Sequence, residues 1–229
     1  MKNTLNIAHR GFTRAFPDNT LEAFEAAIQI GVDAIECDIH ETADSQFVVF
    51  HDPEVLGENI NKLSLAEVRN VKLEGGFQIP ALEQTLDLCS GRVRLMLELK
   101  QVQSLESFVT LVTARVKPRD VILISFNRDI VLKLSHLAPE IERSIDTAFA
   151  IKEPVAMAES ARSDAIAVRC PFATVKLVEE VHAHNLSVFV WGCTGITDIR
   201  RVLALDIDGI ISDFPHLVAE ELGRTGLSL

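Results

Sequence analysis

The sequence lacks several features that mark large classes of proteins. Its 22 Lys and Arg stand against 33 Asp and Glu, which gives a net charge of −11. It therefore has no excess of cations with which to displace counterions from a nucleic acid or an anionic membrane. It also lacks any run of about 18 apolar residues, so no membrane-spanning segment or stable membrane anchor is predicted. An anionic substrate must be met by a few local cations or by a bound metal.

The sequence also lacks closely spaced cysteine pairs, and no secretory leader is predicted. The cysteines form no C-x-x-C pair of the kind that holds zinc or carries redox chemistry; they stand at Cys37, Cys89, Cys170 and Cys193. The apolar stretch that follows Met1 is too short for a signal peptide before His9 and Arg10 interrupt it. We interpret the cysteines as free thiols and predict a cytoplasmic protein.

No stretch rich in Pro, Gly or Ser resembles a linker, and no segment is of low complexity. Hydrophobic residues make up 48% of the chain and charged residues 24%, which is ordinary for a globular protein. We therefore expect residues 1–229 to form a single domain.

Short β-branched or aliphatic runs alternate with amphipathic stretches, which predicts a parallel sheet covered by helices. The predicted strands are residues 5–9, 34–39, 47–50, 93–99, 121–125, 143–147, 165–168, 187–191 and 209–212. The first predicted helix begins at Asn19, where Asn19 and Glu22 form a capping pattern, and Gly31 ends it. Later helices are predicted over residues 104–116, 128–137, 153–161, 174–184, 197–205 and 215–222.

The run at residues 47–50 follows its predecessor too closely for a parallel crossover, which needs a dozen or more residues. We predict that it returns as the second arm of a hairpin turning at Asp44 and Ser45. Eight strands then remain, which predicts an α/β fold: a single (β/α)8 TIM barrel with a short β-hairpin extension after strand 2. A doubly wound open sheet is the alternative, although no G-x-G-x-x-G follows the first strand.

Acidic residues stand at the ends of two predicted strands, where a barrel places its chemistry. Strand alternation points Glu36 and Asp38 to one face, and Glu98 ends the next parallel strand. Three carboxylates buried without partners would cost several kcal/mol. A hard divalent cation, Mg²⁺ or Ca²⁺ rather than zinc, is the expected reason for them.

Two histidines are predicted at the same mouth. His9 ends the first strand, and a two-residue turn would place His51 directly opposite Asp38. Hydrolysis without a Ser or Cys nucleophile needs a general acid and a general base, which this pair would supply.

Other polar residues have simpler interpretations. Asn19 is explained by its predicted helix cap, and no role is predicted for His40. Trp191 ends the seventh strand and would either line a substrate pocket or fill the barrel. Asp213, after the eighth strand, is expected to hold a loop rather than a ligand.

A series of short motifs runs along the chain: His9-Arg10-Gly11, Pro17-Asp18-Asn19-Thr20, Glu36-x-Asp38, Thr42-x-Asp44, Val48-Val49-Phe50-His51-Asp52, Ile79-Pro80-x-Leu82-Glu83, Glu98-x-Lys100, Ser125-Phe126 and Asp208-Gly209-Ile210-Ile211-Ser212-Asp213-x-Pro215. Together these motifs resemble the glycerophosphodiester phosphodiesterase family in order and spacing. The resemblance spans about residues 5 to 216, nearly the whole chain.

The resemblance implies a (β/α)8 barrel whose three acids bind a divalent cation, usually Mg²⁺ or Ca²⁺, with Mn²⁺ also possible. It implies that His9 and His51 are the acid/base pair, with Arg10 and Lys100 near the phosphate. Trp191 is a further candidate for substrate binding. The Trp-Thr-x-Asn element of the family here reads Trp-Gly-Cys-Thr, which leaves the accepted head group open.

The expected reaction is metal-dependent hydrolysis of a small glycerophosphodiester to sn-glycerol 3-phosphate and an alcohol, as part of lipid and glycerol metabolism. One alternative is a lysophospholipase D-like activity, which needs an apolar lip for the acyl chain. The 53–80 connection offers only scattered apolar residues for it: Val55, Leu56, Ile60, Leu63 and Leu65. The other alternative is a non-catalytic phosphodiester-binding barrel. The oligomeric state, the metal and the identity of the base stay open.

Overall fold

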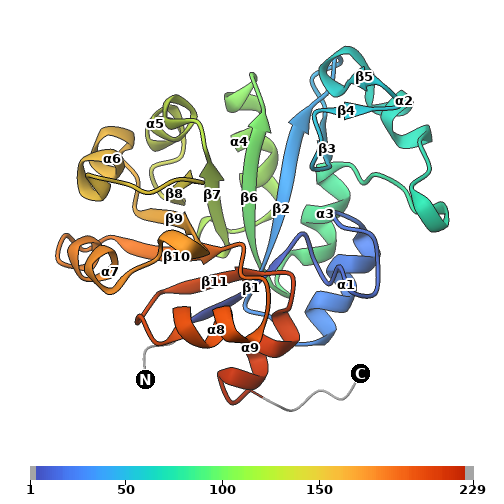
Figure 1. Cartoon of the computed structure of the whole chain (residues 1–229). Helices are drawn as coiled ribbons and strands as arrows, with labels where there is room; N and C mark the ends of the chain where they lie inside the picture. Colours follow the sequence, from blue (N-terminus) through green and yellow to red (C-terminus); the bar gives the residue numbers. More distant parts are fainter. Residues whose placement is uncertain (1–3, 225–229) are drawn as a thin grey trace.

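The computed structural model describes residues 4–224, so residues 1–3 and 225–229 of the predicted domain lie outside the description. Within it, eight parallel strands form a closed barrel in the order β1-β11-β10-β9-β8-β7-β6-β2 (Figure 1). They are β1 (Leu5–His9), β2 (Ala34–Glu41), β6 (Arg94–Gln101), β7 (Val121–Ser125), β8 (Glu142–Thr147), β9 (Ala165–Arg169), β10 (Ser187–Trp191) and β11 (Gly209–Ser212). Both ends of each strand lie within two residues of the predicted ends.

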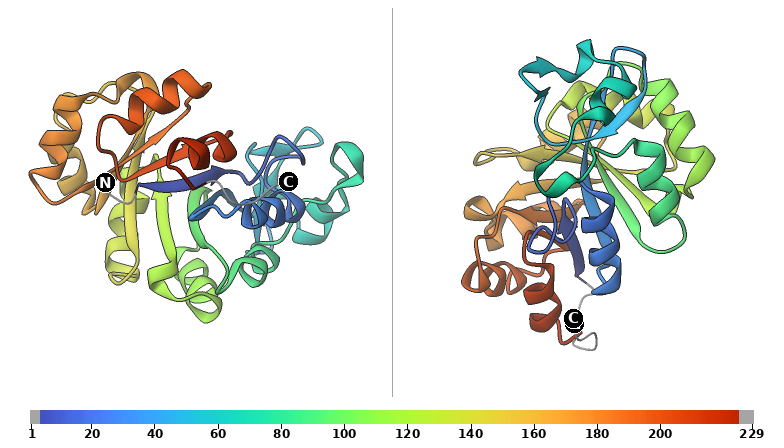
Figure 2. Two further views of the ribbon diagram at one scale, coloured as in Figure 1. Left: turned by 90° about the horizontal axis from the view of Figure 1, so that it is seen from below. Right: turned by 90° about the vertical axis from the view of Figure 1, so that its right-hand side faces the viewer.

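Helices surround the barrel on its outer side (Figure 2). They are α1 (Leu21–Gln29), α3 (Leu82–Cys89), α4 (Leu105–Arg115), α5 (Arg128–Leu137), α6 (Pro154–Ala161), α7 (Val175–His182), α8 (Ile196–Leu203) and α9 (Pro215–Glu221). Helix α3 was not predicted. Among residues 4–224, no helix has the length and apolar character needed to span a bilayer.

Strand β1 closes the barrel because it is paired on both sides. Leu5 is in register with Gly209 of β11, and Ile7 is in register with Ala34 of β2. An open doubly wound sheet would leave its outermost strands unpaired on one side, so the alternative prediction is wrong. Gly209 also has a packing role, since a Cβ there would lie 2.8 Å from the ring of Phe189 inside the barrel.

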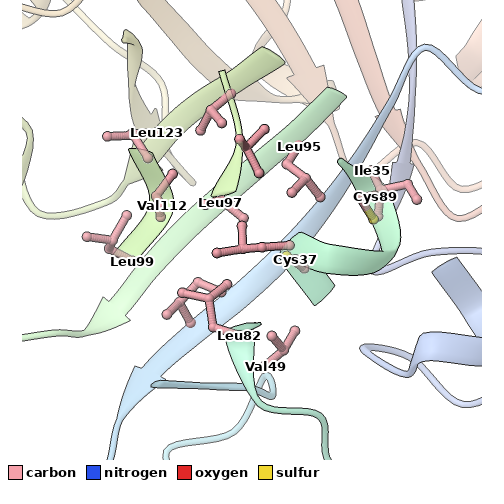
Figure 3. Close-up of a cluster of buried hydrophobic side chains, with 14 of the residues drawn as sticks. Ile35, Cys37, Val49, Leu82, Cys89, Leu95, Leu97, Leu99, Val112 and Leu123 are labelled. Carbon is pink, nitrogen blue, oxygen red and sulfur yellow. The ribbon is translucent and has the colours of Figure 1, made fainter. Parts of the chain in front are cut away.

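The outer faces of the strands pack against the helices. One buried cluster joins the strands to helix α3 (Figure 3). It contains Ile35 and Cys37 of β2, Leu97 of β6, and Leu82 and Cys89 of α3. All four cysteines are buried and unpaired, as predicted. Because side chains alternate along a strand, the residues that flank Cys37 point to the other face, into the barrel.

The predicted hairpin is present, but its register differs by one residue. Strand β3 (Phe47–Val49) pairs antiparallel with β2, with Ile39 opposite Val49. The turn is a three-residue loop, because the Thr42 amide donates to the Gln46 carbonyl and Ser45 adopts a positive φ of 55°. The Phe50 amide therefore donates to the Asp38 carbonyl, and His51 is not directly opposite Asp38 as predicted.

The segment after β3 forms a small lobe beside the barrel mouth, above β2 and β3 in Figure 1. It contains β4 (Glu54–Val55), β5 (Glu58–Asn59), and α2 (Leu65–Asn70). Its apolar residues pack into a core of their own around Val48, including Ile60. These residues therefore stabilise the lobe itself.

The start of α1 corrects a second prediction. The helix cap is Thr20, whose hydroxyl accepts from the Ala23 amide at 3.2 Å. Asn19 precedes the cap and adopts a left-handed φ of 56°. Its side chain is therefore available for another role.

Candidate active site

The inward-facing side chains at the carboxyl ends of the strands line one pocket of about 220 Å³. Its polar wall consists of His9, Arg10, Glu36, His51, Glu98, Lys100, Asp146 and Trp191, and its apolar wall of Ile124, Phe126 and Ile211. Every predicted site residue except Asp38 lines this pocket. Asp38 lies fully buried beside it, in contact with Arg10 and Lys100.

The three predicted acids form one buried cluster. Glu36, Asp38 and Glu98 each offer a carboxylate oxygen, and these atoms lie within 4.8 Å of one another. Burial, followed by the neighbouring negative charges, raises the pKa of Glu36 well above its usual range. Burial also raises the pKa of Glu98. For Asp38 burial acts in the same direction, but the cations Lys100 and Arg10 outweigh it and lower the pKa.

The cluster fits a hard divalent cation. Glu36 Oε1 is buried and has no hydrogen-bond partner in the described chain. Lys100 Nζ lies 3.1 Å from Asp38 Oδ1 and 2.5 Å from Glu98 Oε1, so it meets part of the remaining negative charge. An all-oxygen donor set is the kind that Mg²⁺ and Ca²⁺ prefer. These acids could therefore hold such an ion.

Asn19 supports the acidic cluster, and the sequence interpretation did not predict this role. Its amide Nδ2 donates to Asp38 Oδ2 at 2.8 Å, and the Asp38 backbone amide donates to Asn19 Oδ1 at 3.2 Å. This paired arrangement orients the Asp38 carboxylate. The left-handed φ of Asn19, which asparagine tolerates better than most residues, allows its side chain to turn inward instead of capping α1.

Each predicted catalytic histidine contacts a carboxylate through the same ring nitrogen. His9 Nδ1 lies 2.6 Å from Asp213 Oδ1, and His51 Nδ1 lies 2.7 Å from Asp52 Oδ1. If Nδ1 carries the proton, Nε2 is the basic nitrogen on both rings. Asp213 thus orients a histidine, which corrects the expectation that it only holds a loop. Its hydrogen bond to His9 lowers the pKa of Asp213.

His40 also has a role that was not predicted. Its Nε2 lies 3.1 Å from the His51 carbonyl oxygen, so it fixes the backbone from which the second histidine projects. Burial lowers the pKa of His40, which favours the neutral ring.

The His-Arg-Gly turn after β1 positions Arg10. The Arg10 amide donates to Glu36 Oε2 at 3.1 Å, while its Nε lies 3.1 Å from Asp38 Oδ2. A Cβ at Gly11 would lie 2.8 Å from Ala23, and the φ of Gly11 is 89°. Only glycine fits there, because both the close approach of α1 and the positive φ exclude a side chain.

Trp191 and Asp146 contact each other on a different wall of the pocket from the acidic cluster. They come from β10 and β8, whereas the acids come from β2 and β6. The Trp191 indole Nε1 donates to Asp146 Oδ1 at 2.7 Å, and the Phe126 ring packs edge-on against the indole at 5.9 Å. Trp191 therefore lines the pocket. Burial raises the pKa of Asp146 to about 8. The sequence interpretation missed Asp146. Asp146 stands two residues after Ser144 on the inward face of β8, so the alternation of side chains that indicated Glu36 and Asp38 applies to it as well.

The sequence pattern of the glycerophosphoryl diester phosphodiesterase family matches residues 9–217. The chain belongs to this family. Family membership makes it a phosphoric diester hydrolase and confirms the resemblance and the barrel expected from the motifs. The alternative of a non-catalytic barrel is therefore not favoured.

Relatives match over nearly their whole length. A glycerophosphodiester phosphodiesterase of Caldanaerobacter subterraneus is 28% identical, with 97% of this chain and 99% of the relative covered. Another from Bacillus altitudinis is 29% identical over 91% of this chain and 94% of its own. The fold is shared with an Oleispira antarctica phosphodiesterase, solved with sn-glycerol-3-phosphate, at a TM-score of 0.88 and 24% identity over 95% of this chain and 96% of that one.

Proposed function

We propose that this family member hydrolyses glycerophosphodiesters to sn-glycerol 3-phosphate and an alcohol with the help of a divalent cation. The observation that carries the proposal is one pocket lined by His9, His51 and two of three clustered buried acids. The fold relative from Oleispira antarctica holds sn-glycerol-3-phosphate as its product, which supports the product assigned here.

Glu36, Asp38 and Glu98 would hold the cation, with Mg²⁺, Ca²⁺ and Mn²⁺ as the candidates. When bound, a divalent cation supplies positive charge for the phosphate oxygens and increases the acidity of a coordinated hydroxyl. Arg10 offers a planar set of donors to the phosphate, and Lys100 offers a compact positive charge. Both side chains line the pocket, so they can bind the substrate from beside the acids.

The histidines would carry the protons. His9 Nε2 takes the proton of the substrate's 2-hydroxyl, whose oxygen forms a new bond to phosphorus. The bond from phosphorus to the departing alcohol breaks as His51 Nε2 donates a proton to that oxygen. Water then opens the cyclic phosphate, with His51 as the base and His9 as the acid. Asp213 and Asp52 hold the rings through Nδ1 during both steps.

Lysophospholipids form a second candidate class, for which the structure offers one observation. Phe126 and Phe149, in the loops after β7 and β8, are 46% and 77% exposed. They provide an apolar lip at the mouth that does not depend on the 53–80 lobe.

The test compares glycerophosphocholine, glycerophosphoethanolamine and lysophosphatidylcholine, each with Mg²⁺, and measures released sn-glycerol 3-phosphate or its acylated form. We expect turnover of the glycerophosphodiesters and a loss of about 100-fold or more in His9→Ala and in His51→Ala. Near wild-type turnover in either variant would contradict the mechanism. Preferred cleavage of lysophosphatidylcholine would favour the second class.

A further inference from the structure

Asp146 lines the pocket, and one of its two carboxyl oxygens is fixed by hydrogen bonds. The residue is 8% exposed and is the last but one of β8. Its Oδ1 accepts from the Trp191 indole at 2.7 Å and from the Thr147 amide at 2.6 Å. Within residues 4–224, no hydrogen-bond donor contacts Oδ2. The proposed proton transfers do not use this carboxyl, so its burial in the pocket wall needs another explanation.

The chemistry around Asp146 favours a neutral hydroxyl group as its ligand. No Lys, Arg or His of the described chain forms an ion pair with it. Burial and the charge of Glu98 raise its pKa to about 8, which favours a protonated carboxyl at neutral pH. Such a carboxyl can both donate to and accept from an alcohol oxygen.

A cationic head group fits this wall less well. An ammonium ion is held by aromatic faces, but each ring here already has a protein cation beside it. Lys100 Nζ lies 5.6 Å from the centre of the Phe126 ring, and the Arg169 guanidinium lies 5.9 Å from that of Trp191. A further positive charge would be repelled.

The position of Asp146 then selects one hydroxyl of the substrate. Under the proposed function, the groups that meet the phosphate and the 2-hydroxyl lie on β1, β2 and β6. Asp146 lies on β8, beyond the apolar side chain of Ile124 on β7, and Ile124 and Trp191 offer a surface for the glycerol carbons.

We propose that Asp146 is a specificity-determining residue whose Oδ2 binds the free primary hydroxyl of the substrate's glycerol unit. This proposal rests on the proposed function and extends it. An acyl ester at that position removes the donor hydroxyl and adds bulk beside a buried carboxyl, so Asp146 selects deacylated glycerophosphodiesters over lysophospholipids.

The test pairs two substrates with four proteins. The substrates are glycerophosphocholine and its analogue that lacks the primary hydroxyl. The proteins are the wild type, Asp146→Ala, Asp146→Asn and Asp129→Ala, a control that removes an exposed carboxyl from the first turn of α5. We expect Asp146→Ala to lower kcat/KM for glycerophosphocholine about 10- to 100-fold, the range of one buried hydrogen bond. For the deoxy analogue, Asp146→Ala should change kcat/KM by less than about threefold.

A purely structural role would give a different result. If Asp146 only positioned the indole, Asp146→Ala would lower kcat/KM for both substrates by the same factor, and that outcome would overturn the proposal. Trp191 is the single tryptophan of the chain, so its fluorescence emission reports the indole contact directly. Asp146→Asn keeps an acceptor for Nε1 and should preserve the emission, whereas Asp146→Ala should shift it.

Binding measurements separate this proposal from the proposed function. Calorimetry with Mg²⁺ compares sn-glycerol 3-phosphate with its 1-deoxy analogue and requires no turnover. We expect the wild type to bind the hydroxylated phosphate about 10- to 100-fold more tightly, and Asp146→Ala to lose this preference. Equal affinities in the wild type, or no binding of either phosphate, would contradict the role of Asp146. Absence of diester cleavage with the preference intact would contradict only the proposed reaction.

Discussion

The ring of His9 and the carboxylate of Asp213 are joined by a 2.6 Å contact between Nδ1 and Oδ1. One residue ends the first strand of the barrel and the other follows the last, so closure of the barrel itself assembles this pair. The contact fixes the ring orientation and stabilises the charge that the ring acquires when it accepts a proton.

Asp213→Asn is therefore expected to lower kcat by about 10- to 100-fold, a smaller loss than the roughly 100- to 10,000-fold expected for His9→Ala. Combining both substitutions should cost no more than His9→Ala alone, because Asp213 acts through the histidine. Steady-state kinetics on glycerophosphocholine measure this, with Asp129→Asn as an exposed control. Independent, multiplicative losses in the double variant would contradict a shared role.

Asn19 and Asp38 support a prediction about stability. Asn19→Ala and Asn19→Gly both remove the two hydrogen bonds to Asp38, which should cost about 1–3 kcal/mol of unfolding free energy. The glycine variant should be the more stable of the two, because glycine adopts the φ of 56° without strain. Urea denaturation compares them. An alanine variant as stable as the wild type would show that the paired bonds do not hold the carboxylate.

The same substitutions should weaken cation binding. Residues that orient a metal ligand commonly contribute about 10- to 100-fold to metal affinity, so calorimetric titration with Mg²⁺ or Ca²⁺ should show a loss of that size in Asn19→Gly. The glycine variant is the useful one here because it separates the amide from backbone strain. Unchanged affinity would indicate that Asp38 needs no support.

Short strand-like runs and the alternation of side chains along them carried most of what the sequence could predict. The runs identified the eight barrel strands and placed Glu98 at the end of one of them, and alternation put Glu36 and Asp38 on one face, because the period of two is a property of the backbone itself. The same rule applied to β8 would have indicated Asp146. That residue was missed because the predicted strand, residues 143–147, contains no second acid; Glu142, which alternation places on the same face, lies just outside those bounds.

Details that depend on a single backbone angle could not be predicted. The positive φ of Ser45 lengthens the hairpin loop by one residue and moves His51 out of the expected register. His51 still lines the pocket, because it follows the last residue of β3 that pairs with β2 and its position is not fixed by that pairing. The positive φ of Asn19 likewise moves its side chain from a helix cap to Asp38. The contact of His9 with Asp213 depends on barrel closure, which no local pattern encodes.

The raised pKa of Asp146 predicts a pH dependence of stability. The pKa is about 8 in the folded protein and 3.8 for the unperturbed group, so the folded state keeps the proton that the unfolded state loses between these values. The contribution of Asp146 to the stability of the wild type should therefore fall across that window, by up to about 1.4 kcal/mol per pH unit. Asp146→Asn has no such proton, so its stability relative to the wild type should rise by a few kcal/mol from pH 4 to pH 8. Urea denaturation in EDTA measures this, and a constant difference would contradict it.

The buried acids predict opposite effects of one substitution with and without metal. Glu36 Oε1 is buried and unpaired, so Glu36→Gln should raise Tm in EDTA by removing a carboxyl with an unfavourable environment. The same variant should lose most of the Tm increase that Mg²⁺ or Ca²⁺ gives the wild type. Glu54→Gln, which alters an exposed glutamate of the lobe, is the control. An unchanged metal-induced increase in Glu36→Gln would exclude Glu36 as a ligand.

The most direct test of the account is release of sn-glycerol 3-phosphate from glycerophosphocholine before chelation, after EDTA, and after addition of Mg²⁺, Ca²⁺ or Mn²⁺ in excess. The account predicts that EDTA abolishes release and that at least one of these cations restores it in the wild type but not in Glu36→Gln. Undiminished release in EDTA, or a loss that none of the cations reverses, would contradict the claim that the three clustered acids hold a cation on which the reaction depends.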